Sequence, residues 1–446
     1  MQGRGDWWVC GLALSSYSGF SSCGDGMRFL LLYKGTYGAA LRGPEMRYAA
    51  LASELVELGH EVSLCGRSGD SRGVPENVDF VRVSNAWTLL KAFLRSDAIL
   101  LHGGGPLVLL LAILSGLLGK RVVLDGYVPH WIELDEVISN GAGASAPKLL
   151  IKAYFNVARS LLGALVFNLI IVANKRQLDM FRGMMAPFAL THEFPRVTII
   201  PFGCSEQQNW SQEEGRALLA ELADTSFSRD DFLIGWLGGT YGWFDLGGVL
   251  TEVSKAISRN KKIKMIFFGV DEQRKDELLA FVDTAARGNI LFLPWVDFSR
   301  RFDYWAGFDV SLVWGSEGYE NDYASRTRNF DCLTLGLPIV QNDDDEWGSR
   351  LRRSGAGVVA DQSALSDVLF ELSNNSDKVS AMRASMSALA PQFYWGRFAT
   401  KLVDRIKTSP MSLGRRVIGL TAFCLALPAV FMFFAFTFIM AIFKRS

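Results

Sequence analysis

Short apolar runs alternate with amphipathic stretches through most of the chain. The first run, Arg28–Tyr33, is followed by a helical pattern over Glu45–Leu58, which Gly59 ends, and then by a second run, Glu61–Cys65. These three segments predict a β-α-β unit. The same alternation predicts five further strands in this half of the chain, at Phe80–Val83, Ala98–Leu101, Arg121–Leu124, Leu169–Ala173 and Val197–Ile200. Strands that alternate with helices predict a parallel sheet covered on both faces.

The alternation restarts after a polar stretch over residues 204–231. Strands are predicted at Phe232–Leu237, Ile263–Gly269, Ile290–Leu293, Val310–Trp314 and Pro338–Gln341, with helices at Leu246–Ser258, Asp271–Ala286, Phe298–Phe308 and Thr327–Leu335. Each half is long enough to form a domain. We therefore predict an α/β chain of two Rossmann-like domains, residues 27–203 and 232–375, joined by the linker 204–231 and followed by helices and a basic linker over residues 376–416. Ligands of such domains bind at the carboxyl ends of the strands.

Two segments depart from this pattern. Residues 1–26 are rich in Gly and Ser and lack helical periodicity, so they are predicted to be a disordered extension. Residues 417–443 carry no charge, and a helix of that length measures about 40 Å, more than the roughly 30 Å of a bilayer core. A transmembrane helix is the prediction, with a buried hairpin as the alternative. The excess of Lys and Arg before it predicts that both domains lie on the cytoplasmic side of an inner or plasma membrane.

Composition narrows the classes of function. The 46 basic and 46 acidic residues balance, so the chain has no overall field that would attract nucleic acid. Six cysteines without a C-x-x-C pair and only four histidines predict neither a zinc site nor a disulfide framework. We therefore expect no cofactor and no bound metal.

The stretch over residues 326–340 is the most informative part of the sequence. A short helix is predicted to begin at Ser325 or Thr327, which places Arg326 and Arg328 at its start. Unpaired backbone amides and the helix dipole favour an anion there, so a pyrophosphate could bind. Asp331, one turn later, could accept hydrogen bonds from a ribose. The alternative is an ordinary helix with solvated arginines.

Two glycine-containing loops are predicted to face the cleft between the domains. In the second domain, the amides of Gly239 and Thr240 would make another phosphate-binding turn, and Asp245 would cap the next helix. In the first domain, the loop lacks the G-x-G-x-x-G pattern of a dinucleotide site. Its candidates for contact with the ligand on the acceptor side are Gly38, Arg42 and Arg47, although its glycines could also serve only to shape the loop.

Further polar residues follow two strands of the first domain. Asp125, Tyr127, His130 and Glu133 come after one strand, and His102 comes after its neighbour. We expect them at the same edge of the sheet, on the acceptor side of the cleft. A structural role is the alternative for each histidine.

An acidic run occupies residues 343–346. It could be a metal-binding motif or a solvated loop. We predict the loop, with Glu346 as its member that contacts substrate.

These features together resemble the GT-B glycosyltransferases, and most closely the large retaining family that includes sucrose and mannosyl transferases. The resemblance is carried by the tandem domains, by Gly238-Gly239, and by Asp-x4-Gly-x-Pro-Ile-Val from Asp331 to Val340. Residues 59–62 support it in the first domain.

The resemblance implies roles for individual residues. Asp331 occupies the position of the second Glu of the family's Glu-x7-Glu motif, which binds the ribose of the donor, whereas the first Glu falls on Tyr323. The family's basic pair is absent from residues 241–250. Arg326 and Arg328 would take over its contacts with the donor phosphates. The Thr-Arg-x-x-Asp pattern is similar to that of bacterial surface-polysaccharide enzymes.

The expected function is that of a membrane-anchored, metal-independent glycosyltransferase. It would move a sugar from a nucleotide-diphosphate sugar to a glycan acceptor, lipid-linked in our reading, in surface-polysaccharide or glycolipid synthesis. Asp125 and His130 are the catalytic candidates, and the resemblance implies that His130 or His102 contacts the donor sugar, with retention of configuration. A sugar-nucleotide epimerase of the same fold, and a non-catalytic module that binds nucleotide sugars or scaffolds other enzymes, are the alternatives.

Overall fold

The first domain is built on a seven-stranded parallel sheet. The computed structural model describes residues 26–70, 72–102, 106–127, 132, 167–186, 196–242, 244–342 and 346–409, together with Val417, Thr421 and Cys424. The strand order is β5-β3-β1-β6-β7-β8-β9, with bounds β1 (Arg28–Leu32), β3 (Glu61–Gly66), β5 (Asp79–Arg82), β6 (Ala98–Leu101), β7 (Arg121–Asp125), β8 (Leu169–Val172) and β9 (Arg196–Ile199). Its described helices are α1 (Gly43–Glu57), α2 (Ala86–Arg95), α3 (Pro106–Leu117) and α6 (Lys175–Met185). A short pair, β2 (Thr36–Tyr37) and β4 (Ser68–Gly69), lies beside them.

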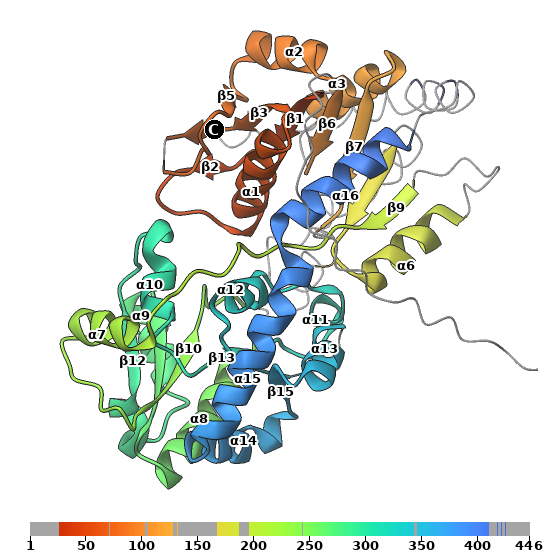
Figure 1. The fold of residues 1–446 in the computed structure, drawn as a ribbon. Coiled ribbons are helices and arrows are strands. Elements are labelled where there is room, and N and C mark those ends of the chain that lie inside the picture. Colours follow the sequence, from red (N-terminus) through yellow and green to blue (C-terminus); the bar gives the residue numbers. More distant parts are fainter. Residues whose placement is uncertain are drawn as a thin grey trace, which may run out of the picture.

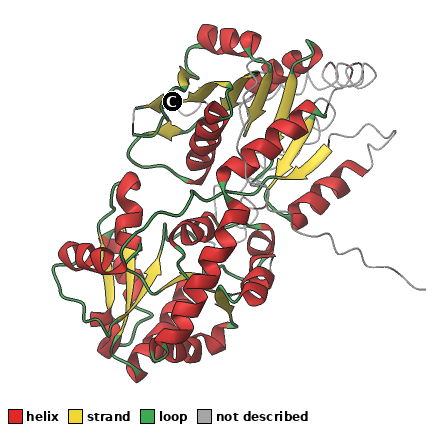
Figure 2. Cartoon of the chain, in the orientation of Figure 1, coloured by secondary structure: helices red, strands yellow, loops and turns green. Residues whose placement is uncertain are grey.

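The second domain, below the first in Figure 1, repeats this plan with six parallel strands. The order is β12-β11-β10-β13-β14-β15, with bounds β10 (Phe232–Trp236), β11 (Ile263–Phe268), β12 (Ile290–Leu293), β13 (Val310–Val313), β14 (Ile339–Gln341) and β15 (Gly357–Val359). Figure 2 shows helices on both faces of this sheet, namely α8 (Leu246–Arg259), α9 (Glu272–Leu279), α10 (Arg301–Trp305), α11 (Tyr319–Tyr323), α12 (Thr327–Leu335), α13 (Glu346–Ser354) and α14 (Leu365–Ser373). The prediction of two parallel-sheet domains is confirmed.

Strand order places the ligand crevice of each domain. In the first sheet, β3 and β5 follow β1 on one side, and the strands from β6 onward lie on its other side, so the order reverses between β1 and β6. In the second sheet, the order reverses in the same way between β10 and β13. Ligands of such sheets bind outside the carboxyl ends of the two central strands. The relevant loops are therefore those that follow β1, β6, β10 and β13.

The predicted linker contains a helix that the polar pattern did not reveal. Helix α7 (Gln212–Leu222) begins after Ser211, whose hydroxyl oxygen accepts a hydrogen bond from the Glu214 amide (3.2 Å). The predicted helix over residues 271–286 is shorter than expected. It ends as α9 (Glu272–Leu279), after which the amides of Phe281 and Val282 bond three residues back instead of four, to the carbonyls of Leu278 (3.1 Å) and Leu279 (3.2 Å). The Asp283 amide then donates to the Ser254 hydroxyl (3.0 Å), and a 3-10 turn (Thr284–Asn289) follows.

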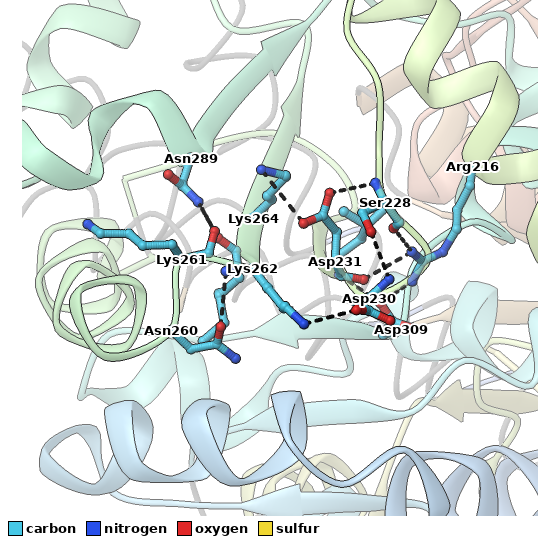
Figure 3. A network of polar contacts seen from close by, with 12 residues as sticks. Arg216, Ser228, Asp230, Asp231, Asn260, Lys261, Lys262, Lys264, Asn289 and Asp309 are labelled. Atoms are coloured by element: carbon cyan, nitrogen blue, oxygen red, sulfur yellow. Dashed lines mark hydrogen bonds and ion pairs between the residues drawn. The ribbon is translucent and has the colours of Figure 1, made fainter.

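A polar network fastens α7 to the edge of the second sheet that lies away from the cleft (Figure 3). Arg216 of α7 pairs with Asp309, just before β13, at 2.6 Å. The same carboxylate accepts a hydrogen bond from the Leu233 amide of β10 (2.7 Å). Arg216 also donates to the carbonyl of Asp231 (3.0 Å). These contacts fix the linker to the second domain and leave the cleft edge free.

The chain crosses between the domains twice, and the two crossings lie side by side. After α15 (Ser376–Leu389), helix α16 (Trp395–Lys407) leaves the second domain and packs on α1 of the first (Figure 1). The Cys204 amide donates to the Phe393 carbonyl (2.8 Å), and the Trp395 amide donates to the Cys204 carbonyl (3.2 Å). The buried face of α16 repeats at helical spacing, with Trp395, Phe398, Ala399, Leu402, Val403 and Ile406.

The hydrophobic core continues across the junction of the domains. One buried cluster contains residues from both sheets and includes Phe202 of the first crossing. The ring of Phe202 is 5.9 Å from that of Tyr127, 5.5 Å from that of Phe330 and 4.8 Å from that of Trp395. The junction is thus a packed interface rather than a pair of free linkers.

The two terminal segments lie largely outside the residues that the structure describes. Of the predicted extension over residues 1–26, the structure describes Gly26 alone, and of the predicted span 417–443 it describes three isolated positions. Among the residues that are described, no helix has the length and apolar character needed to cross a bilayer.

Candidate functional site

The predicted helix of the second domain forms as expected. Helix α12 spans Thr327–Leu335, and Gly336 ends it with a left-handed backbone (φ 63°). Arg326 is the N-cap residue, its backbone is extended, and no side chain caps the first turn. The amides at the start of α12 thus remain available for an anion.

Arg328 is the most unusual side chain near this helix start. It is 94% buried, with 6% of its surface exposed. Its guanidinium lies 4.5 Å from the ring centroids of both Trp236 and Phe244. Within the described residues, Nη1 of Arg328 has no hydrogen-bond partner. Burial, followed by repulsion from Arg326, lowers the pKa of Arg328 to about 9. A bound anion would relieve both effects.

The glycine loop after β10 lies directly against this guanidinium. Nη2 of Arg328 donates to the Gly239 carbonyl at 3.3 Å. Gly238 has φ +127°, and a Cβ there would lie 3.2 Å from Nη2 of Arg328, so this position requires glycine. The amides of Gly239 and Thr240 donate to no acceptor in the part of the chain that is described. The loop, the helix start and the buried cation therefore converge on one spot.

Arg326 does not extend freely into the cleft. Its two terminal nitrogens bind both carboxylate oxygens of Glu320, at 2.7 and 2.6 Å, and both side chains are largely buried. Glu320 was not among the residues predicted for the site. It neutralises Arg326, and among the described residues Arg328 is left without a carboxylate partner.

The first domain brings a second helix start to the same place. A Cβ on Gly43, the first residue of α1, would lie 3.0 Å from the methyl carbon of Thr327. The α1 N-cap, Arg42, is exposed, and α1 has no side-chain cap. The N-terminal ends of α1 and α12, which carry the positive ends of the two helix dipoles, therefore lie next to each other at the cleft.

Asp331, one turn after Arg328 on α12, lines a cavity of about 410 Å³ between the domains. Its carboxylate pairs with Arg301 at 3.0 Å. Burial raises the pKa of Asp331, while the charge and hydrogen bond of Arg301 oppose that rise. Phe298 and Phe302 flank the Arg301 guanidinium at 3.7 and 3.9 Å. Arg301 is a partner that the sequence pattern did not reveal, because it comes from a distant helix.

Arg47 and Asp125 occupy positions different from those expected. Arg47 Nε lies 2.9 Å from the Asp125 carboxylate, with 1% and 0% of the two side chains exposed. Arg47 also donates to the carbonyls of Pro201 (2.7 Å) and Ile200 (2.9 Å). The second oxygen of Asp125 accepts from the Tyr127 amide (3.2 Å). The pair holds the first crossing against the sheet, and the roles predicted for Arg47 and Asp125 at the acceptor stay predictions.

The remaining candidates of the first domain are only partly brought together. Tyr127 is buried, and its hydroxyl donates to the Ser325 carbonyl of the second domain (2.7 Å). His102 is buried at the end of β6, with Nδ1 3.1 Å from the Asp125 carbonyl. Gly38 lies near Asp70 of a neighbouring loop, because a Cβ at position 38 would be 3.3 Å from the Asp70 carboxylate. His130 and Glu133 lie outside the described residues.

Glu346 starts α13 and lines a larger cavity at the domain junction. It accepts a hydrogen bond from the Lys175 amide (3.3 Å) and pairs with Arg350 (2.6 Å). Residues 343–345 are not described. Among the residues that are, no three His, Cys, Asp or Glu side chains gather as they would around a metal ion.

Comparison with known proteins shows which solved structures have this fold. No family model and no curated protein matches the sequence. Among solved structures, WaaG, a glycosyltransferase involved in lipopolysaccharide biosynthesis, is 14% identical with a TM-score of 0.59, covering 85% of this chain and 99% of its own. HepE of Anabaena, solved with UDP and glucose, is 11% identical with a TM-score of 0.58, covering 86% and 100%. A putative UDP-N-acetylglucosamine 2-epimerase from Listeria monocytogenes is 11% identical with a TM-score of 0.51, covering 87% and 100%. The chain therefore has the GT-B fold of the glycosyltransferases.

Proposed function

We propose that this protein is a glycosyltransferase that uses a nucleotide-diphosphate sugar. The observation that carries the proposal is Arg328, which lies between the Gly239 loop and the start of α12. Its guanidinium is buried, and among the described residues it has no acid partner and its Nη1 has no hydrogen-bond partner. A buried cation of this kind is costly unless an anion completes it. A diphosphate supplies that charge, and arginine binds phosphate oxygens in a bidentate fashion.

The same arrangement suits the chemical step. When the bond between the sugar and the diphosphate breaks, negative charge develops on the leaving phosphate oxygen. Arg328, the amides of Gly239 and Thr240 and the two helix starts would stabilise that charge in place. This set of donors needs no metal ion to be effective, so we propose a metal-independent reaction without a cofactor. Asp331 would bind the ribose of the donor.

The acceptor is proposed to be a glycan carried by a lipid, in surface-polysaccharide or glycolipid synthesis. WaaG, which shares the fold, is involved in lipopolysaccharide biosynthesis. In this chain the uncharged stretch over residues 417–443 would hold both domains at the cytoplasmic face of an inner or plasma membrane. His130 stays a candidate for contact with the reacting sugar, and retention of configuration stays an implication of the family resemblance.

The decisive experiment compares nucleotide binding and turnover in Arg328→Gln and in Arg229→Gln. Arg229 is a matched control, because its variant removes one positive charge from a side chain that is 93% exposed. Thermal shift against a panel of nucleoside diphosphates should show stabilisation of the wild type and of the control. Arg328→Gln should lose about tenfold or more in affinity.

Product analysis separates the competing activities. Release of free nucleoside diphosphate together with transferred or hydrolysed sugar supports the transferase. Conversion of one nucleotide sugar into its epimer would favour the epimerase whose fold this chain shares. Binding without any turnover would favour a non-catalytic module. Equal nucleotide binding in both variants would overturn the donor site itself.

A further inference from the structure

A second cavity at the domain junction is separate from the donor site. It has a volume of about 830 Å³, and residues of both domains line it. Its walls include the start of α6, the first turns of α13 and one face of α16. We call it the junction cavity. Phe330 of α12 faces it, whereas Arg328 of the same helix contacts the Gly239 loop. One helix, about 10 Å across, therefore lies between the two sites.

The charges around the junction cavity are unbalanced. Five cationic and two acidic side chains line it. Three of the cations have acid partners, as in the pairs Arg176–Asp322 (3.0 Å) and Arg350–Glu346 (2.6 Å). Arg397 and Lys401, one turn apart on α16, form no ion pair with any described residue. The surplus positive charge is therefore concentrated on one helix face.

The surroundings of Lys401 favour its uncharged form. Burial, followed by repulsion from Arg405 and Arg397, lowers the pKa of Lys401. Among the described residues, the one acceptor for Nζ of Lys401 is a backbone carbonyl, that of Ile199 (3.0 Å). The charge of an anion held between Arg397 and Lys401 would offset this lowering of the Lys401 pKa.

The floor of the cavity is apolar and aromatic. The rings of Phe330, Trp347 and Phe393 form a contiguous set, with centroid separations of 5.2 Å for Phe330–Trp347 and for Trp347–Phe393. Phe398 and Pro201 complete the lining on the side of the first domain. A site with a cationic rim and an apolar floor suits a molecule that has both an anionic and an apolar part.

We propose that the junction cavity binds an amphipathic phosphate ester, with the phosphate between Arg397 and Lys401 and the apolar part on the aromatic floor. The ester we assign is the phosphate that links the acceptor glycan to its lipid, and this assignment rests on the proposed function. Placement supports a lipid source, because the uncharged stretch begins sixteen residues after Lys401 on the same C-terminal segment. A free nucleotide has the same chemistry and is the alternative source.

The test uses the full chain purified in detergent and follows tryptophan fluorescence, since Trp347 lines the cavity. Farnesyl phosphate is the probe, farnesol is its uncharged counterpart, and UDP represents the nucleotide source. The double variant Arg397→Gln/Lys401→Gln should bind farnesyl phosphate about tenfold or more weakly. The matched control Arg405→Gln/Lys407→Gln removes two charges from the same helix outside the cavity and should bind like the wild type.

The outcomes separate this proposal from the donor site. Arg328→Gln should keep its affinity for farnesyl phosphate, and the Arg397/Lys401 double variant should keep its nucleotide affinity. Equal affinities in the two double variants, or farnesol binding as tightly as its phosphate, would overturn the cavity assignment. Displacement of farnesyl phosphate by UDP in Arg328→Gln protein would overturn the lipid source in favour of the nucleotide. Failure of the donor site would appear separately, as unchanged nucleotide binding in Arg328→Gln.

Discussion

At the scale of single residues, the buried arginines of this protein differ in whether a carboxylate pairs with them. Arg47 has a carboxylate and two carbonyls as partners, and Arg326 has both oxygens of Glu320. Arg328 has two aromatic faces and one carbonyl. Cation–π contacts recover only part of the cost of removing a guanidinium from water. In the protein without ligand, the Arg328 guanidinium is therefore a destabilising group, and a bound anion would compensate its charge.

Replacement of Arg328 by methionine should consequently separate stability from binding. Methionine fills similar space without a charge, and such replacements of buried ionic groups are often neutral or stabilising, by about 1–4 kcal/mol. We expect a melting temperature equal to or above that of the wild type without nucleotide, and no further rise when nucleoside diphosphate is added. Differential scanning calorimetry measures both.

A matched variant tests whether this effect is particular to Arg328. Arg326→Met would break a buried pair and leave Glu320 without its cation, so its melting temperature should fall clearly. A fall of the same size in Arg328→Met would show that Arg328 stabilises the fold, and the ligand-based explanation of its burial would then be wrong.

At the scale of elements, local patterns predicted five of the six strands of the second domain, but missed β15 and the helices α11, α13 and α14. Helix α12 and strand β12 have the predicted bounds, since a glycine in the left-handed region ends the helix and a run of apolar residues fills the strand. The partners of charged side chains could not be predicted in the same way. Arg301 lies thirty positions from Asp331, and Arg47 lies further still from Asp125, so only the tertiary fold brings these pairs together.

The return of α16 to the first domain was also not predictable from its own sequence. The amphipathic pattern indicates that α16 has a buried face, but it does not say which domain provides the partner. The partner is α1, and Glu54 of α1 lies at this contact, close to Gly396. Burial, followed by repulsion from Glu57 and Glu206, raises the pKa of Glu54 to about 7.

This shift makes the α1–α16 contact sensitive to pH. The carboxyl of Glu54 holds its proton more tightly in the folded state, so stability is greatest below the unfolded pKa near 4.5 and falls as the pH rises through about 7. Glu54→Gln should therefore stabilise the protein at pH 8, by about 1 kcal/mol after allowance for its half-exposed position, and have little effect at pH 5. Thermal melts at the two pH values measure the difference.

An exposed acid provides the control for this pH effect. Glu221 of α7 is exposed and forms no ion pair with described residues, so Glu221→Gln should leave the melting temperature nearly unchanged at both pH values. A gain from Glu54→Gln that was the same at pH 5 and pH 8 would show that ionisation of Glu54 is not its cause.

At the scale of the whole molecule, the first domain holds the segment that leads into the donor site. Gln177 Nε2 and Asn174 Nδ2 donate to the Tyr323 carbonyl, at 2.8 and 3.0 Å. The Tyr127 hydroxyl donates to the Ser325 carbonyl at 2.7 Å. These side chains of one domain thus satisfy successive carbonyls of the other, immediately before Arg326. The orientation of the domains and the position of the α12 start are therefore coupled.

Tyr127→Phe tests this coupling with the loss of one hydroxyl group. Removal of a buried hydrogen bond costs about 1 kcal/mol, or about a fivefold change in a local opening equilibrium. Hydrogen–deuterium exchange of the amides at Ala324 and Asn329 should accelerate by that factor, and nucleotide affinity should fall to a similar extent. Tyr319→Phe is the control, because Tyr319 is 68% exposed on the adjoining helix.

The comparison between the two tyrosine variants shows whether the Tyr127 hydroxyl positions the donor site or only holds the two domains together. If the hydroxyl of Tyr127 only holds the domains together, exchange will rise throughout the interface, including the Cys204 amide that pairs the two crossings. If it positions the donor site, the change will be confined to the segment before α12 and will be accompanied by weaker nucleotide binding. We expect the second pattern, because the packed rings around Phe202 hold the crossings together without this hydroxyl.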